Sequence, residues 1–152
     1  MKEMKTNRRP AQETQLLVDG CNVMRELQAT ERSRSSGDFA AFGRCLNAVA
    51  NRADRICHLW PACKATVVFD GPRGTHRAHS PYTSIVPSGG SGSDRADNCI
   101  VQDVTRLRST ASSPFIIVVT NDRELRVKAL LAGANEAWYI EDFLRMANRA
   151  AA

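Results

Sequence analysis

Three short apolar segments that run directly into acidic residues constrain the fold of this chain most strongly. Gln15–Asp19 and Ala65–Asp70 each end in an aspartate, and Phe115–Thr120 stops two residues before Asp122. All three are almost continuous apolar runs rather than alternations of apolar and polar residues, which is typical of parallel strands covered on both faces. The sequence therefore predicts a parallel sheet whose strands end close to carboxylates.

Segments with a helical spacing of apolar residues alternate with these strands. The longest begins at Asp38, a suitable helix cap, and is ended by Pro61. Strands that alternate with helices predict an α/β fold with helices on both faces of the sheet. We expect strands at 15–19, 65–70, 82–86, 115–120 and 135–140, helices at 20–28, 38–60, 94–107, 121–131 and 141–150, and loops at 71–80 and 88–93.

The length and composition indicate one domain without a membrane span. The chain has 152 residues, of which 43% are hydrophobic and 24% charged, as is ordinary for a globular domain. No apolar run approaches the ~20 residues of a membrane span, and no apolar segment follows the basic N-terminus as in a secretory signal. We expect a flexible basic tail over residues 1–12, one domain over residues 13–152, and a cytoplasmic location in which the five cysteines stay reduced.

The motifs of several common enzyme classes are missing. The sequence contains no G-x-x-x-x-G-K-[ST], G-x-G-x-x-G or G-x-S-x-G pattern. Asp19 is followed by Gly-Cys rather than the x-Asp of a haloacid-dehalogenase phosphatase, and Glu141 follows the last strand where a receiver domain would carry a lysine. The net charge of +5 is compatible with a nucleic-acid partner, because basic side chains neutralise phosphates.

The carboxyl ends of the expected strands gather acidic and amide side chains. Asp19, Asp70 and Asp122 follow three of the strands, and Asn22 stands three residues after Asp19. In an open α/β sheet the carboxyl ends of the strands lie at one edge, where ligands bind. We therefore expect these side chains to lie together.

Two further acids, Asp94 and Asp97, open the helix that follows the Gly/Ser-rich segment 88–93. Residues three apart share a face of a helix, and Asp97 is in line with the buried stripe that begins at Ile100, so its side chain is expected to point toward the same edge. Carboxylates this close repel one another unless a cation lies between them. Mg²⁺ or Mn²⁺ would bind such oxygen ligands and activate a water for attack on a phosphodiester.

Each of these residues also has a structural explanation. Asp-Gly after a strand is a common turn, which covers Asp19 and Asp70. Asp94 is suitable as a helix cap, and Asn121 stands three residues before a glutamate, the spacing of a capping box. Asp97 is the hardest to explain in this way, because an inward-facing acid costs free energy unless it is paired. The joint placement at one edge favours a metal site.

Four sequence blocks carry a resemblance to a known family. They are LLVDGCNV (16–23), VVFDGPRG (67–74), SGSDRADNCI (91–100) and VVTNDREL (118–125). In this order they resemble the NYN domain in its YacP-like branch, which belongs to the PIN-like nuclease superfamily. The resemblance extends from about residue 15 to residue 140.

The resemblance implies a three-layer α/β/α sandwich with a parallel five-stranded sheet of order 3-2-1-4-5. It also implies an endoribonuclease that binds magnesium or manganese and cleaves single-stranded or structured RNA; some relatives in this branch cleave messenger RNA on the ribosome. By motif, the catalytic and metal-binding acids would be Asp19, Asp97 and Asp122. The supporting residues would be Asn22, Asp70, Asp94, Thr120 and Asn121.

Two functions remain open at this point. The first is a divalent-metal-dependent endoribonuclease in which basic residues beside the acidic edge contact the RNA backbone. These residues would be Arg73, His76, Arg77, Arg95 and Arg123. The second is a non-catalytic RNA-binding module that keeps a vestigial acidic pocket.

Overall fold

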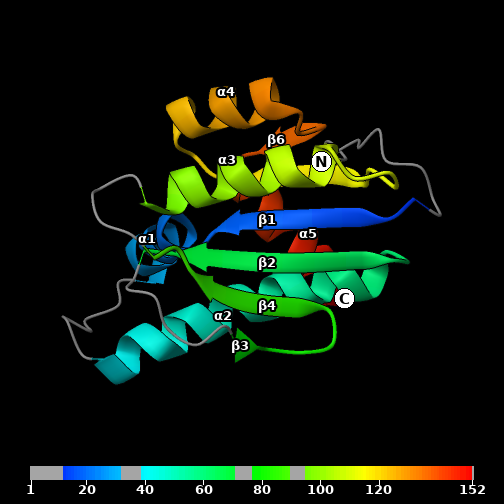
Figure 1. Ribbon diagram of the computed structural model, residues 1–152. Helices are drawn as coiled ribbons and strands as arrows, with labels where there is room; N and C mark the ends of the chain where they lie inside the picture. The colour runs from blue at the N-terminus through cyan, green and yellow to red at the C-terminus, as the bar shows by residue number, and fades with distance from the viewer. Residues whose placement is uncertain (1–11, 32–38, 71–76, 90–94, 152) are drawn as a thin grey trace.

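A six-stranded sheet forms the centre of the molecule (Figure 1). The computed structural model describes residues 12–31, 39–70, 77–89 and 95–151. The strand order across the sheet is β3-β4-β2-β1-β5-β6. The strands are β1 (Thr14–Asp19), β2 (Cys63–Phe69), β3 (Arg77–Ala78), β4 (Thr83–Pro87), β5 (Phe115–Val119) and β6 (Glu136–Trp138).

β1 lies between two parallel neighbours, β2 and β5. The register places Val18 beside Val67 on one side and beside Val119 on the other. Every residue of β5 is buried, and so are all but one of β1. Burial of both faces explains why these strands are continuous apolar runs in the sequence.

Helices cover both faces of the sheet, which is the middle layer of three (Figure 1). Leu16 and Val18 of β1 pack in one core with the first, second and last helices, whereas Leu17 packs in a second core with the other two. This division follows from the strand geometry, because successive side chains point to opposite faces. The helices are α1 (Gly20–Glu31), α2 (Phe39–Leu59), α3 (Arg95–Arg108), α4 (Arg123–Ala132) and α5 (Ile140–Ala151).

The predicted three-layer α/β architecture is confirmed, but the purely parallel five-stranded sheet is wrong at one edge. The segment 71–80, expected to be a loop, contributes β3, which pairs antiparallel with β4. The backbone N–H groups of His79 and Ser80 both donate to the carbonyl oxygen of Thr83, at 2.8 and 3.1 Å, and so reverse the chain. The sheet is therefore mixed, and its order differs from the predicted 3-2-1-4-5 through this additional strand.

Two expected segments fall largely outside the described residues. Of the tail expected over residues 1–12 only Gln12 is described, and the loop expected over 88–93 is described through Gly89. Within the described ranges, no helix is long and apolar enough to cross a membrane.

Gly20 connects β1 to α1 at a point where the neighbouring strand leaves no room for a side chain. A Cβ atom at this position would lie 2.9 Å from Val67 Cγ1 and 2.9 Å from the Val68 carbonyl oxygen, both on β2. The Asp-Gly pair after β1 is therefore required by the close approach of α1 to the sheet.

Replacing Gly20 with Ala is expected to destabilise the protein by about 1–3 kcal/mol, because the added methyl group overpacks this contact. Helix propensity alone predicts the opposite effect, an increase in the free energy of unfolding by up to about 1 kcal/mol. Thermal unfolding separates the two effects, with Asn98→Ala on the exposed face of α3 as the control for a substitution that adds helix propensity without a close contact. A melting temperature at or above that of the parent would contradict the close approach.

Candidate functional site

The carboxyl ends of the central strands carry the predicted acids. Asp19 is the last residue of β1, Asp70 directly follows β2, and Asp122 stands three residues after β5. α3 begins at the same edge of the sheet and carries Asp97 in its first turn (Figure 1). The fold thus brings side chains from four separate segments of the chain to one edge.

Asp19 is buried at this edge, with only 5% of its surface exposed. Thr120 Oγ1 donates a hydrogen bond to Asp19 Oδ2 at 2.9 Å, and the backbone N–H of Asn22 donates to Oδ1 at 3.4 Å. Burial raises the pKa of the Asp19 carboxyl above its usual value, against the opposing effect of these two hydrogen bonds. None of the ion pairs among the described residues involves Asp19.

Thr120 links the ends of β1 and β5 through its completely buried hydroxyl. The hydroxyl donates to Asp19 and accepts a hydrogen bond from the backbone N–H of Asp122 at 3.0 Å. Thr120 Oγ1 also lies 3.5 Å from Asn22 Oδ1, which accepts a shorter bond of 2.8 Å from the backbone N–H of Asn121. A hydroxyl has one hydrogen to donate, so the shorter contact with Asp19 takes it. Thr120 therefore fixes both Asp19 and the turn that carries Asp122.

Asp122 caps α4 and Asn121 caps α5. Asp122 Oδ1 accepts hydrogen bonds from the backbone N–H groups of Glu124 and Leu125, at 2.9 and 3.1 Å. Asn121 Oδ1 accepts from the backbone N–H of Ile140 at 2.9 Å, where α5 begins. The capping-box assignment of Asn121 is wrong, because Asp122 supplies the cap of α4. Within the described residues, Oδ2 of Asp122 makes no hydrogen bond or ion pair, which leaves it for a ligand.

Asp70 anchors the start of α3. Its Oδ1 accepts a hydrogen bond of 2.8 Å from the backbone N–H of Ala96, and its own N–H donates to Cys21 Sγ at 3.3 Å. Asp97 directly follows Ala96 and is half-buried. Asp70, at the end of β2, therefore fixes the backbone that carries Asp97 in α3.

Four of the predicted residues cannot be placed with their side chains. Asp94, Arg73 and His76 lie outside the described residues, and of Arg95 only the backbone is described, at the first position of α3.

The two remaining arginines of the predicted RNA contact lie in different places. Arg123 is exposed at the first position of α4, directly after Asp122. Arg77 lies on the edge strand β3, and its Nη2 donates to Asn47 Oδ1 of α2 at 2.7 Å. β3 is three strand spacings from β1, which is about 14 Å at ~4.8 Å each. The structure therefore does not bring Arg77 beside Asp19.

Arg25 is a residue of this edge that the sequence analysis missed. Its positive charge lowers the pKa of Asp19, in opposition to the larger effect of burial. Its Nε donates to the carbonyl oxygen of Cys21, one turn earlier in α1, at 3.4 Å. The signal that could have found it is the start of α1 directly after Asp19, because the second turn of such a helix lies close to the strand end.

The side chains at this edge fit a hard divalent cation in their chemistry. They offer carboxylate, amide and hydroxyl oxygens, the ligands that Mg²⁺ and Mn²⁺ prefer. Within the described residues, no group of three or more His, Cys, Asp or Glu side chains could hold a metal ion. Mg²⁺ commonly keeps several waters and takes only one or two carboxylates directly, so such a compact group is not required.

Comparison with known proteins identifies the family. The sequence profile of the YacP-like NYN domain matches residues 16–151. The chain belongs to this family. The crystal structure of Rae1 (YacP) from Bacillus subtilis has a similar fold, with a TM-score of 0.67 at 19% sequence identity, over 90% of this chain and 76% of that chain. No curated protein matches the sequence. The predicted YacP-like NYN domain is thereby confirmed.

Replacing Thr120 with Val is expected to lower the free energy of unfolding by about 1–3 kcal/mol, because it removes the hydroxyl that bonds Asp19 and the Asp122 N–H. It should also raise the pKa of Asp19 further, since the lost hydrogen bond favours the charged form. Thermal melting and a carbon-13 NMR titration of the carboxyl group measure the two effects.

Thr83→Val is the matched control for Thr120→Val. Thr83 is also buried, and its hydroxyl donates to Asp54 Oδ1 at 2.9 Å, away from Asp19. It should destabilise the protein to a similar extent without affecting Asp19. An unchanged Asp19 pKa in Thr120→Val would mean that the hydroxyl does not orient the acid.

Proposed function

We propose that this YacP-like NYN domain is a divalent-metal-dependent endoribonuclease that cleaves RNA phosphodiester bonds. Membership of the family makes it a nuclease-like, RNA-related domain. The observation that supports metal-dependent RNA cleavage concerns Asp19. Its carboxyl group is 5% exposed, has a pKa raised by burial and makes no ion pair among the described residues. A buried acid of this kind costs folding free energy, and such perturbed groups concentrate at functional sites.

In this proposal Asp19, Asp97 and Asp122 hold Mg²⁺ or Mn²⁺ together with its waters, so that one or two of the carboxylates bind the ion directly and the rest bind it through water. The bound ion would neutralise charge on the phosphate and lower the pKa of the attacking water. Thr120 orients Asp19 through its hydroxyl, and the two cap bonds of Asp122 fix the direction of its remaining oxygen. Asn22 joins the turn after β5 to α1.

The other supporting residues act through the backbone. Asp70 positions α3 and with it Asp97, and Asn121 ties the turn after β5 to α5. Asp94 remains a predicted neighbour of the ion. Cleavage of messenger RNA on the ribosome, the finer substrate that the resemblance implies, also stays a prediction.

Asp97→Asn is expected to lower the cleavage of single-stranded RNA in Mn²⁺ by at least ~100-fold, because lost charge stabilisation typically costs about 10²–10³ in rate. The metal-free variant should be as stable as the parent, or more stable by ~0.5–2 kcal/mol, because a functional acid is removed. Mn²⁺ should raise the melting temperature of the parent more than that of the variant, since it binds the folded state. The assays are RNA cleavage and thermal melting, each with Mn²⁺ and with EDTA.

Asp103→Asn provides the matched control. Asp103 is half-buried on the same helix and pairs with Arg106 at 3.5 Å, beyond the first turn of α3. This variant should cleave RNA like the parent. If Asp97→Asn melts far lower in EDTA, Asp97 is a structural residue. Parental cleavage by Asp97→Asn would place the active site elsewhere.

The alternative function is a non-catalytic RNA-binding module with a vestigial acidic pocket. It predicts that the protein binds RNA but leaves it intact, with identical results in Mn²⁺ and EDTA. Cleavage that requires Mn²⁺ and stops in EDTA would exclude it.

Of the arginines predicted to contact the RNA backbone, Arg123 is the one whose described side chain lies at the acidic edge, because it is exposed directly after Asp122. Arg123→Ala should weaken binding to all RNA sequences alike and reduce the slope of log K against log salt by about one. Binding titrations at several salt concentrations measure this slope. Arg106→Ala, at the opposite end of α3, should leave this slope unchanged. Equal slopes in the two variants would show that Arg123 does not contact the RNA backbone.

A further inference from the structure

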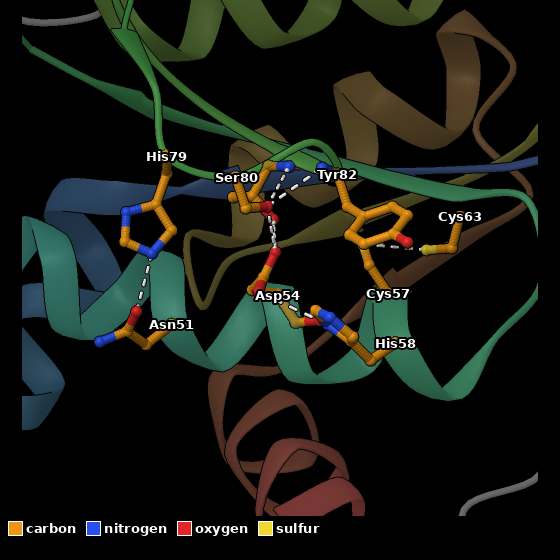
Figure 2. A network of polar contacts seen from close by, with 9 residues as sticks. Asn51, Asp54, Cys57, His58, Cys63, His79, Ser80 and Tyr82 are labelled. Atoms are coloured by element: carbon orange, nitrogen blue, oxygen red, sulfur yellow. Dashed lines mark hydrogen bonds and ion pairs between the residues drawn. The ribbon is translucent and has the colours of Figure 1, made fainter.

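Cys57 and Cys63 form a thiol pair at the end of the sheet opposite the acids. Cys57 lies in the last turn of α2, and Cys63 is the first residue of β2. Their Sγ atoms are 3.3 Å apart, and the residues are only 3% and 2% exposed. Figure 2 marks the contact between the two side chains with a dashed line. A disulfide has an S–S distance of ~2.05 Å, so the sulfur atoms need to approach by only about 1.3 Å.

The turn between the two cysteines is fixed at both ends, which keeps the sulfur atoms in contact. The backbone N–H of Trp60 donates to the carbonyl oxygen of Ile56 at 3.1 Å and continues the helical hydrogen bonds. The carbonyl oxygen of Ala62 accepts from the N–H of Thr14 at 3.0 Å, and Ala62 has a left-handed φ of 55°. The pair is therefore preorganised by backbone that is tied to β1 and to α2.

A cavity lies directly beside both cysteines. It has a volume of about 390 Å³ and is lined by Cys57 and Cys63 together with the partly exposed rings of His58 and Tyr82. These two rings meet edge to face, with centroids 4.9 Å apart. The two cysteines are thus shielded from the surface and form part of the cavity wall.

A polar network holds the wall of this cavity in place (Figure 2). Asp54 Oδ1 accepts hydrogen bonds from the hydroxyls of Ser80 and Thr83, which joins α2 to the chain before β4. His58 Nδ1 lies 2.8 Å from the Asp54 carbonyl oxygen. Because α2 and β4 are joined here, the network fixes the backbone that carries His58 and Tyr82 beside the cavity.

We propose that Cys57 and Cys63 are a redox site that a hydroperoxide oxidises to a reversible disulfide. One thiol attacks the O–O bond, which breaks to give a sulfenic acid and, with the thiol proton, an alcohol, or water when the oxidant is hydrogen peroxide. The second thiol attacks that sulfur and releases water, so each thiol loses one proton and one electron in total. A dithiol reductant reverses the reaction by thiol–disulfide exchange.

The contact between the sulfur atoms, rather than thiol acidity, singles out this pair. The hydrogen bond to Cys63 and burial raise the pKa of the Cys57 thiol, and burial also raises the pKa of Cys21 and Cys99. Reaction of Cys57 is therefore expected to be slower than that of a low-pKa thiol. The neighbouring sulfur then captures the sulfenic acid before further oxidation.

Peptide mapping of the full chain tests this site directly. The protein is treated with hydrogen peroxide, denatured, alkylated and digested with trypsin without reduction. Both cysteines lie in one tryptic peptide, Ile56–Lys64, between Arg55 and the following residue Ala65. We expect this peptide to lose two hydrogen atoms and to carry no alkyl group, whereas Cys21, Cys45 and Cys99 are alkylated. Dithiothreitol before alkylation should restore two alkylated cysteines in the peptide.

Stability and two variants provide the second measurement. The disulfide restricts the unfolded chain, so the oxidised parent should melt at a higher temperature than the reduced parent. The rise should be modest, because the closed loop is short. Cys99→Ser, which removes a half-buried thiol elsewhere, should behave like the parent, and Cys63→Ser should show no such rise. Full alkylation of both cysteines after peroxide treatment, sulfinic or sulfonic acid at Cys57 in the parent, or a cross-link to another cysteine would each overturn the proposal.

Discussion

The position of β1 between two parallel strands is the constraint on which the rest of the structure depends. With β2 and β5 on its sides and helices on both faces, β1 is buried along its whole length apart from the half-buried Gln15. Asp19 is therefore buried because it is the last residue of this strand. The same packing leaves no space for a Cβ at position 20, so the turn out of β1 begins with glycine. A buried acid and a close backbone contact are thus produced by one geometric requirement.

Burial of Asp19 opposes folding as long as the group is charged and lacks a cation. The pKa of Asp19 in the folded protein lies above the ordinary value. The free energy of unfolding is therefore higher at low pH, where Asp19 is protonated, and falls as the pH rises through the raised pKa. The Thr120 hydroxyl and the charge of Arg25 offset part of this cost. A divalent cation at the edge would offset more of this cost, which connects the burial of Asp19 to the proposed chemistry.

The two ends of the sheet differ in chemistry. At the carboxyl end, oxygen atoms of distant segments are linked by hydrogen bonds around Thr120. At the amino end, two sulfur atoms are brought together by a tight turn between α2 and β2, beside a cavity. The rigid strands between them separate an oxygen-rich site, suited to a hard cation, from a thiol pair suited to oxidation.

The sequence by itself determined the elements that depend on local pattern. Continuous apolar runs located the buried strands, helical periodicity located α2, and the aspartates at strand ends indicated the edge where a site forms. It could not reveal β3, because two residues are too few for a periodic signal. Only the tertiary structure decided that Asn121 caps α5, that Asp70 anchors α3, and that Cys57 contacts Cys63. Each of these contacts joins two different elements. Their formation depends on how those elements pack and on the register of the strands, which no single segment of the sequence contains.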